Sequence, residues 1–223
     1  MPANDFLRHK NRLRNDTRKL LLKLITATLL VNVLHGCSLI STQEPLITNS
    51  VVPETWPMQH RMLSTLTHWS INGKIGIRQP GQSESAAINN WSQRGDHYNI
   101  DLSSLLLGMG AIHIEGNLDY ILLSDSDEQN IYSDDPESLL EQHAGWTLPL
   151  AYIADWVKGI PSPGSPYRLE FTAEGRLAHV EQSGWTVTYR NFLEVGDYPL
   201  PAKITITDGE RRIIIVINQW QLL

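Results

Sequence analysis

The chain has 223 residues, of which 41% are hydrophobic and 19% are charged, and its formal charge at pH 7 is −6. This length and composition fit one globular domain, or at most two, with enough apolar residues for a sizeable core. The single cysteine excludes an intramolecular disulfide framework, and the acidic balance argues against a general nucleic-acid binder. The sequence also lacks the run of about 20 uninterrupted apolar residues that marks an ordinary membrane span.

Charge is distributed unevenly along the chain. Residues 1–36 hold seven Lys or Arg and two Asp or Glu, a balance of +5, which leaves −11 for the rest of the chain. The stretch from Leu20 to Leu34 has the length of the hydrophobic region of a signal peptide, and only Lys23 and Asn32 interrupt it. We therefore expect residues 1–36 to be a secretory signal. The alternative, a retained membrane span, would need about 20 predominantly apolar residues.

The sole cysteine, Cys37, follows this stretch in the sequence Leu34-His35-Gly36-Cys37. The site resembles the signal of bacterial lipoproteins, in which the thiol receives a diacylglyceryl group, the chain is cut before the cysteine, and the new amino group is acylated. His35 is larger and more polar than the residue usual there, which bears on the efficiency of processing. An Asp after the cysteine commonly retains such proteins in the inner membrane, so Ser38 favours the outer membrane. The alternative for Cys37 is a small buried core residue.

The region after the cysteine divides into a linker and a folded part. Prolines and Ser/Thr residues without a sustained period predict a flexible tether over residues 37–57, which leaves 58–223 for the domain. Helices are predicted over 57–67, after the capping residues 133–137, and over 148–158. Alternating apolar runs predict strands at 71–77, 84–93, 97–103, 110–115, 118–124, 129–133, 167–172, 177–182, 185–190, 202–208 and 211–217.

The connections between these runs are short, which makes consecutive strands antiparallel neighbours. Gly116-Asn117 has the composition of a two-residue hairpin turn, and Asp208-Gly209 is a second strong turn signal. The expected fold class is mainly β (α+β), with two or three helices and all strands in one sheet.

Motifs for catalysis or metal binding are missing from the sequence. It has no Gly-rich phosphate loop, no His-Glu-x-x-His, no nucleophile elbow and no cysteine pair. The acidic cluster Asp125, Asp127 and Glu128 lacks the glycine and terminal Glu of a calcium loop. We expect a protein that is not an enzyme, with no catalytic residue and no metal site.

The segment from Ser103 to Gly110 conflicts with ordinary turn chemistry. It places Leu105, Leu106 and Leu107 between serines and glycines, where polar residues are expected. Either the leucines extend a strand into the core, or they form an exposed apolar loop whose solvation cost is relieved on contact with lipid.

These features resemble the LolB family, outer-membrane lipoproteins that receive other lipoproteins from the periplasmic carrier LolA and place them in the outer membrane. The resemblance is carried, in the expected order, by the lipoprotein cysteine, Trp91-Ser92-Gln93 with Gly95-Asp96 and Tyr98, the Leu107-Gly108 loop, residues 155–161, residues 184–189, and the stretch from Leu200 to Trp220.

The resemblance implies an open, incomplete antiparallel β-barrel over residues 58–223, with covering helices and an apolar cavity for acyl chains. The candidate lining residues are Ile75, Ile77, Trp91, Leu102, Ile112 and Ile114 from the strands and Ile153 and Trp156 from a helix, and each also fits a plain core position. A family leucine at the tip of a protruding loop, needed for delivery into the bilayer, corresponds to Leu107. Leu106 competes for that role and Leu105 lies beside it.

The implied location is the periplasmic face of the outer membrane, with a lipid anchor on Cys37. The implied partners are a LolA-like carrier, cargo lipoproteins and outer-membrane lipid, without nucleic acid and with this chain as a monomer. No cofactor is expected beyond the covalent lipid and the transiently bound acyl chains of the cargo. Two alternatives remain: a structural lipoprotein of an assembly machine, which would lack a deep apolar cavity, and a lipid-modifying enzyme, which would need a nucleophile and a base.

Overall fold

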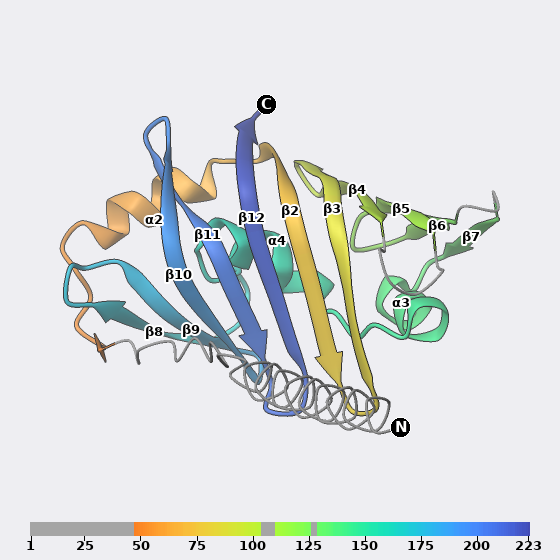
Figure 1. The fold of residues 1–223 in the computed structure, drawn as a ribbon. Helices are drawn as coiled ribbons and strands as arrows, with labels where there is room; N and C mark the ends of the chain where they lie inside the picture. The colour runs from red at the N-terminus through yellow and green to blue at the C-terminus, as the bar shows by residue number, and fades with distance from the viewer. Residues whose placement is uncertain (1–46, 104–109, 126–128) are drawn as a thin grey trace, which may run out of the picture. The chain divides into compact units, whose positions relative to one another are not determined.

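A single open sheet organises the part of the chain that the structure describes. The computed structural model describes residues 47–103, 110–125 and 129–223. Within them, twelve strands follow the order β1-β8-β9-β10-β11-β12-β2-β3-β4-β5-β6-β7, and each pairs antiparallel with its neighbours. Strands β1 and β7 are the two edges, so the sheet does not close (Figure 1). The expected open antiparallel architecture and the single sheet are confirmed.

The strands vary from two to thirteen residues. Those before the central helices are β1 (Thr48–Asn49), β2 (His68–Gln79), β3 (Gln82–Arg94), β4 (His97–Ser103), β5 (Ala111–Gly116), β6 (Ile121–Ser124) and β7 (Asn130–Ser133). Those after them are β8 (Tyr167–Thr172), β9 (Leu177–Gln182), β10 (Trp185–Val195), β11 (Tyr198–Thr207) and β12 (Arg212–Leu222).

One face of the sheet carries the core. On β12, Ile213, Ile215 and Ile217 are buried, whereas Val216 between them is exposed. Ile215 is paired with Ile75 of β2, so the apolar positions of neighbouring strands fall on the same face. This period of two is the pattern that predicted the strands.

The loop between β5 and β6 differs from the prediction. The prediction of a two-residue turn at Gly116-Asn117 is wrong, because four residues, 117–120, connect the strands. The Asn117 side-chain oxygen accepts hydrogen bonds from the backbone N–H groups of Asp119 and Tyr120, at 2.8 and 3.1 Å. This side-chain cap stabilises a longer loop and shortens the predicted strand 118–124 to β6.

Three helices accompany the described part of the sheet, close to the positions expected from the sequence: α2 (Trp56–Ser64), α3 (Pro136–Ala144) and α4 (Leu150–Lys158). The Asp135 carboxylate caps α3 by accepting from the Ser138 N–H, and Gly159, at φ +84°, ends α4. Strand β1 and the first residues of α2 fall within the segment expected to be a tether. In the described residues, no helix has the length and apolar character needed to cross a membrane.

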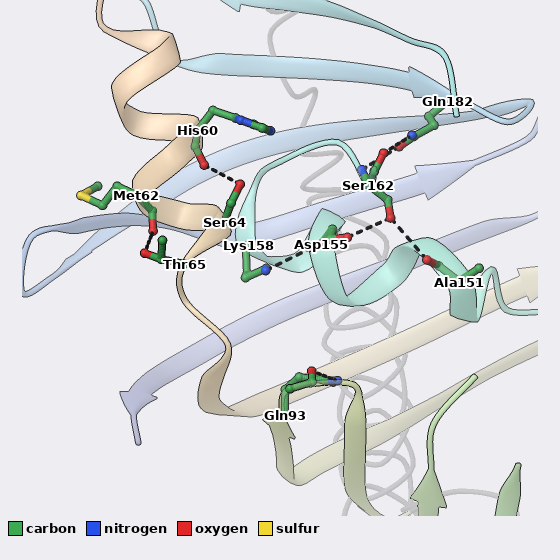
Figure 2. A network of polar contacts seen from close by, with 11 residues as sticks. His60, Met62, Ser64, Thr65, Gln93, Ala151, Asp155, Lys158, Ser162 and Gln182 are labelled. Carbon is green, nitrogen blue, oxygen red and sulfur yellow. Dashed lines mark hydrogen bonds and ion pairs between the residues drawn. The ribbon is translucent and has the colours of Figure 1, made fainter. Parts of the chain in front are cut away.

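The end of α4 is fixed to the sheet by one buried side chain (Figure 2). Gln182 of β9 is 2% exposed, and its Oε1 accepts from Trp156 Nε1 at 2.9 Å and from the Ser162 N–H at 3.0 Å. Its Nε2 donates to the Ser162 carbonyl at 2.7 Å and to Ser165 Oγ at 2.8 Å. Gln182 therefore joins α4 and the segment after it to the β9 strand.

We expect Gln182→Met to lower the free energy of unfolding by about 3 kcal/mol, because several buried groups lose partners at about 1–3 kcal/mol each. Urea denaturation measures the change. Gln221→Met, at an exposed position of β12, is the matched control and should change stability little. Equal stability of the two variants would contradict the anchoring role of Gln182.

Candidate functional site

A cavity of about 300 Å³ lies on the buried face of the sheet. Its walls come from β2, β3, β4, β5 and α4, from residues 64–67 at the end of α2, and from the loops that contain Gly95, Leu118 and Trp146. This volume is at the lower end of the range typical of small-molecule pockets, about 300–1,000 Å³. It is therefore large enough to hold part of a ligand and too large to be a packing defect.

Most of the cavity wall is aromatic or aliphatic. Trp69 of β2 and Trp91 of β3 line it with their ring centroids 5.5 Å apart. Trp146 and Leu148 line it from the segment before α4. Trp146 is held there by a 2.8 Å hydrogen bond from its indole N–H to Glu84 of β3. Such a wall favours hydrocarbon over water.

Polar groups occur at one end of the strands that form the cavity. Leu102 of β4 is paired with Ile88 of β3, and further along the same pair of strands Tyr98 is paired with Gln93. The turn after Gln93 contributes Gly95 and Asp96 to the wall. The cavity thus has an apolar end near Leu102 and a polar end near the β3–β4 turn.

The last turn of α4 adds a partly buried ion pair to the cavity wall (Figure 2). The Lys158 side chain is 8% exposed, and its Nζ lies 3.1 Å from Asp155 Oδ1. The other carboxylate oxygen of Asp155 accepts a 2.8 Å hydrogen bond from Ser162 Oγ. Because two charges lose their hydration when they are buried, this pair is weak evidence for a contribution to stability.

Three further polar atoms of the wall residues lack hydrogen-bond partners within the described chain: Trp91 Nε1, Gln93 Oε1 and the Tyr98 hydroxyl. The Gln93 amide nitrogen does donate, to the Gly95 carbonyl at 3.1 Å. Burial, together with the nearby Tyr120, raises the pKa of Tyr98 to about 12, so its hydroxyl stays protonated at neutral pH. Unpaired buried polar atoms are costly, which indicates that this wall is not optimised for stability alone.

The structure brings five of the eight predicted lining residues to the cavity wall. They are Ile75, Trp91, Leu102, Ile114 and Ile153. Ile77, Ile112 and Trp156 are buried but do not line it. Ile112 instead borders a separate small hollow, and the Trp156 indole N–H is directed to Gln182.

The other predicted site residues lie outside the described chain. These are the lipidation candidate Cys37 and the loop candidates Leu105, Leu106 and Leu107. Among the described residues, no group of three or more His, Cys, Asp or Glu is arranged to hold a metal ion.

Sequence reasoning missed the polar end of the cavity. Asp155 and Lys158 fall within residues 155–161, which carry the family resemblance, and Trp69 precedes the predicted strand at 71–77. The available signal for Lys158 is a cation on the apolar helix that also carries Ile153 and Val157. For Trp69 the signal is its alternation with Ile71, which places both on the buried face.

Comparisons with known proteins agree on one family. A family model described as outer membrane lipoprotein LolB matches residues 67–220. The outer-membrane lipoprotein LolB of Marinobacter nauticus is 36% identical over 204 residues, covering 89% of this chain and 97% of that protein. The LolB of Pseudomonas paraeruginosa is 36% identical over 200 residues, covering 90% of this chain and 96% of that protein.

Among solved structures, a LolA superfamily protein from Nitrosomonas europaea aligns with a TM-score of 0.46 and 11% identity, over 78% of this chain and 94% of that one. The family assignment depends on the sequence matches, which extend over most of the chain. This chain belongs to the LolB family of outer-membrane lipoproteins, and its location is the outer membrane.

Proposed function

We propose that this protein accepts lipoproteins from a LolA-type periplasmic carrier by binding their acyl chains in its cavity, and then inserts them into the outer membrane. The observation that carries the proposal is the mainly apolar cavity under α4, lined by Trp69, Trp91 and aliphatic side chains. A structural lipoprotein without a ligand would be expected to fill this space, because protein interiors are otherwise closely packed.

The hydrophobic effect is sufficient to drive the acyl-chain steps. Each CH₂ group removed from water contributes about 0.8 kcal/mol, so a chain partitions readily into an apolar cavity and from there into a bilayer. Transfer toward sites of increasing affinity requires no nucleotide. The missing phosphate-loop motif is consistent with such a mechanism.

Charge supports the encounter with the carrier. The chain from Cys37 onward has a formal charge of −11, after a leader of +5. An acidic surface attracts a partner with a basic rim and increases the rate of association. In this proposal the protein acts as a monomer, held to the membrane by the lipid on Cys37.

Filling the cavity should block acyl-chain binding. Ala154 of α4 lines the cavity, and we expect Ala154→Phe to weaken binding of an acylated peptide at least about tenfold, since the ring displaces the volume of several CH₂ groups. Brominated acyl chains that quench the fluorescence of Trp69 and Trp91 measure binding. Ala173→Phe, at an exposed turn, is the matched control. Unchanged binding by Ala154→Phe would contradict the cavity as the acyl-chain site.

The leucine loop should act in delivery and not in binding. We expect Leu107→Glu to reduce transfer of a bound lipoprotein into liposomes about tenfold or more, because a charge resists entry into the bilayer. Leu106→Glu, made separately, tests the competing position. Val51→Glu serves as the control, at an exposed apolar residue outside this loop. Normal delivery by both loop variants would refute the role of the loop.

Anchoring should depend on Cys37. We expect Cys37→Ser to move the protein from the membrane fraction to the soluble periplasmic fraction, because two or more acyl chains are needed for a stable anchor. Fractionation and mass spectrometry of the amino terminus measure the change. Lipidated protein in the Cys37→Ser variant would show that another residue carries the anchor.

A further inference from the structure

The polar end of the cavity presents a buried ammonium group. Lys158 lines a cavity whose other walls are mainly apolar, and its side chain is 8% exposed. An ammonium group has three N–H donors, and among the described residues the only ion-pair partner of Lys158 is Asp155. Donor capacity is therefore left over at a wall that a ligand would touch.

The geometry of Asp155 restrains this ammonium group. One carboxylate oxygen of Asp155 lies 3.1 Å from Lys158 Nζ, and the other accepts from Ser162 Oγ. Ser162 is in turn bonded to Gln182 through both its backbone N–H and its carbonyl (Figure 2). The lysine is thus oriented through a chain of hydrogen bonds that begins in the sheet, as expected for a group that positions a ligand.

Charge at the cavity limits which polar group can bind. The charged residues of its wall are Asp96, Asp155 and Lys158, two carboxylates and one ammonium. By formal charge they leave one negative charge in excess, because Asp155 offsets Lys158. Asp96, 71% exposed, lies 2.8 Å from His97 Nδ1 at the open side of the wall. A phosphate group would be repelled by this excess negative charge, and the cation that could attract it is already paired with Asp155. An uncharged acceptor needs only the free N–H donors of Lys158.

The cavity is also polarised along its length. The residues that line the cavity near Leu102 and Trp146, such as Ile88 and Leu148, are apolar. Glu84, which accepts from the Trp146 indole N–H, does not line this cavity and lies at the opposite end of β3 from Gln93. Helix α4 starts at Leu150, shortly after Trp146, and carries Lys158 in its last turn. The ammonium and the apolar end are therefore separated by about the length of α4, which is about 12 Å for the eight 1.5 Å steps from Leu150 to Lys158.

We propose that Lys158 binds the ester carbonyls of a diacylglyceryl cysteine and that the acidic balance of the wall disfavours an anionic phospholipid, which has the same esters but also a phosphate. The inference rests on the proposed acyl-chain function and adds to it the polar group that is recognised and the direction of binding. The glyceryl esters lie at the Lys158 end, and the hydrocarbon chains extend toward Leu102 and Trp146. Asp155 is a positioning residue that holds the ammonium group.

The test compares two ligands that differ only in their carbonyls, and a third that keeps the ester carbonyls but has an anionic headgroup. Binding of the full chain is measured for a diacylglyceryl cysteine peptide, for its analogue with ether links of equal chain length, and for phosphatidylglycerol. We expect about tenfold tighter binding of the ester than of the ether, the effect of one hydrogen bond to a charged group. Phosphatidylglycerol should bind more weakly than the ester peptide.

Variants then assign the preference to one side chain. Lys158→Met should bring the ester-to-ether ratio close to one, while Lys158→Arg, which keeps charge and donors, should retain a preference. Lys74→Met, at an exposed position of β2, is the matched control and should leave the ratio unchanged. A general loss of stability would weaken binding of both ligands and would leave their ratio unaffected.

The outcomes separate the two proposals. If the ester and ether ligands bind equally to the unaltered chain, or if Lys158→Met keeps the preference, the recognition of carbonyls by Lys158 is overturned while acyl-chain binding stands. Phosphatidylglycerol binding as tightly as the ester peptide would overturn the selectivity. If neither the ester nor the ether ligand binds, the proposed function itself fails.

Discussion

An open sheet must cover its apolar face, and in this protein a short helix fixed by one glutamine provides much of that cover. Helix α4 has nine residues, whereas the sheet beside it is built from strands of up to thirteen. Gln182 holds the helix through Trp156 and Ser162, and Gly159, after the last turn of the helix, approaches Pro201 of β11. A cover fixed toward β9 and β11 leaves space over β3 and β4, and that space is the cavity.

The cavity wall contains groups that packing alone would not select. A partly buried ion pair, and polar atoms of Trp91, Gln93 and Tyr98 that have no partner among the described residues, lower stability relative to apolar residues of the same size. Large apolar contacts elsewhere, such as the isoleucine rows of β2 and β12, compensate for that loss. Strand β12 and its contacts with β2 stabilise the fold, whereas β3, β4 and the cavity-facing residues Trp69 and Ile75 of β2 form the site.

The sheet could be predicted well because the alternation that marks strands is a local signal. The cavity could be predicted only in part because its shape depends on how distant segments pack. Alternation identified β12 and β2, but β11 begins at Tyr198, before the predicted residue 202. Pro199 and Pro201 are the reason, because proline within a run argues against a strand. They fit because β11 pairs only with β10 there, its register with β12 beginning at Lys203. Likewise Ile75 and Ile77 share one face by period, yet only Ile75 reaches the cavity. The difference depends on where α4 crosses, which no local pattern specifies.

The direction of the cavity connects the two parts of the proposed mechanism. Its apolar end lies where β4 ends at Ser103 and β5 begins at Ala111, a pair in the sheet register. The segment that joins these strands contains Leu105, Leu106 and Leu107. Hydrocarbon chains that extend from Lys158 toward Leu102 would therefore end beside β4 and β5, the two strands that this segment connects. In the proposed mechanism, in which these leucines enter the bilayer, lipid meets the acyl chains before it meets the polar group, and this order favours partitioning of the chains into lipid.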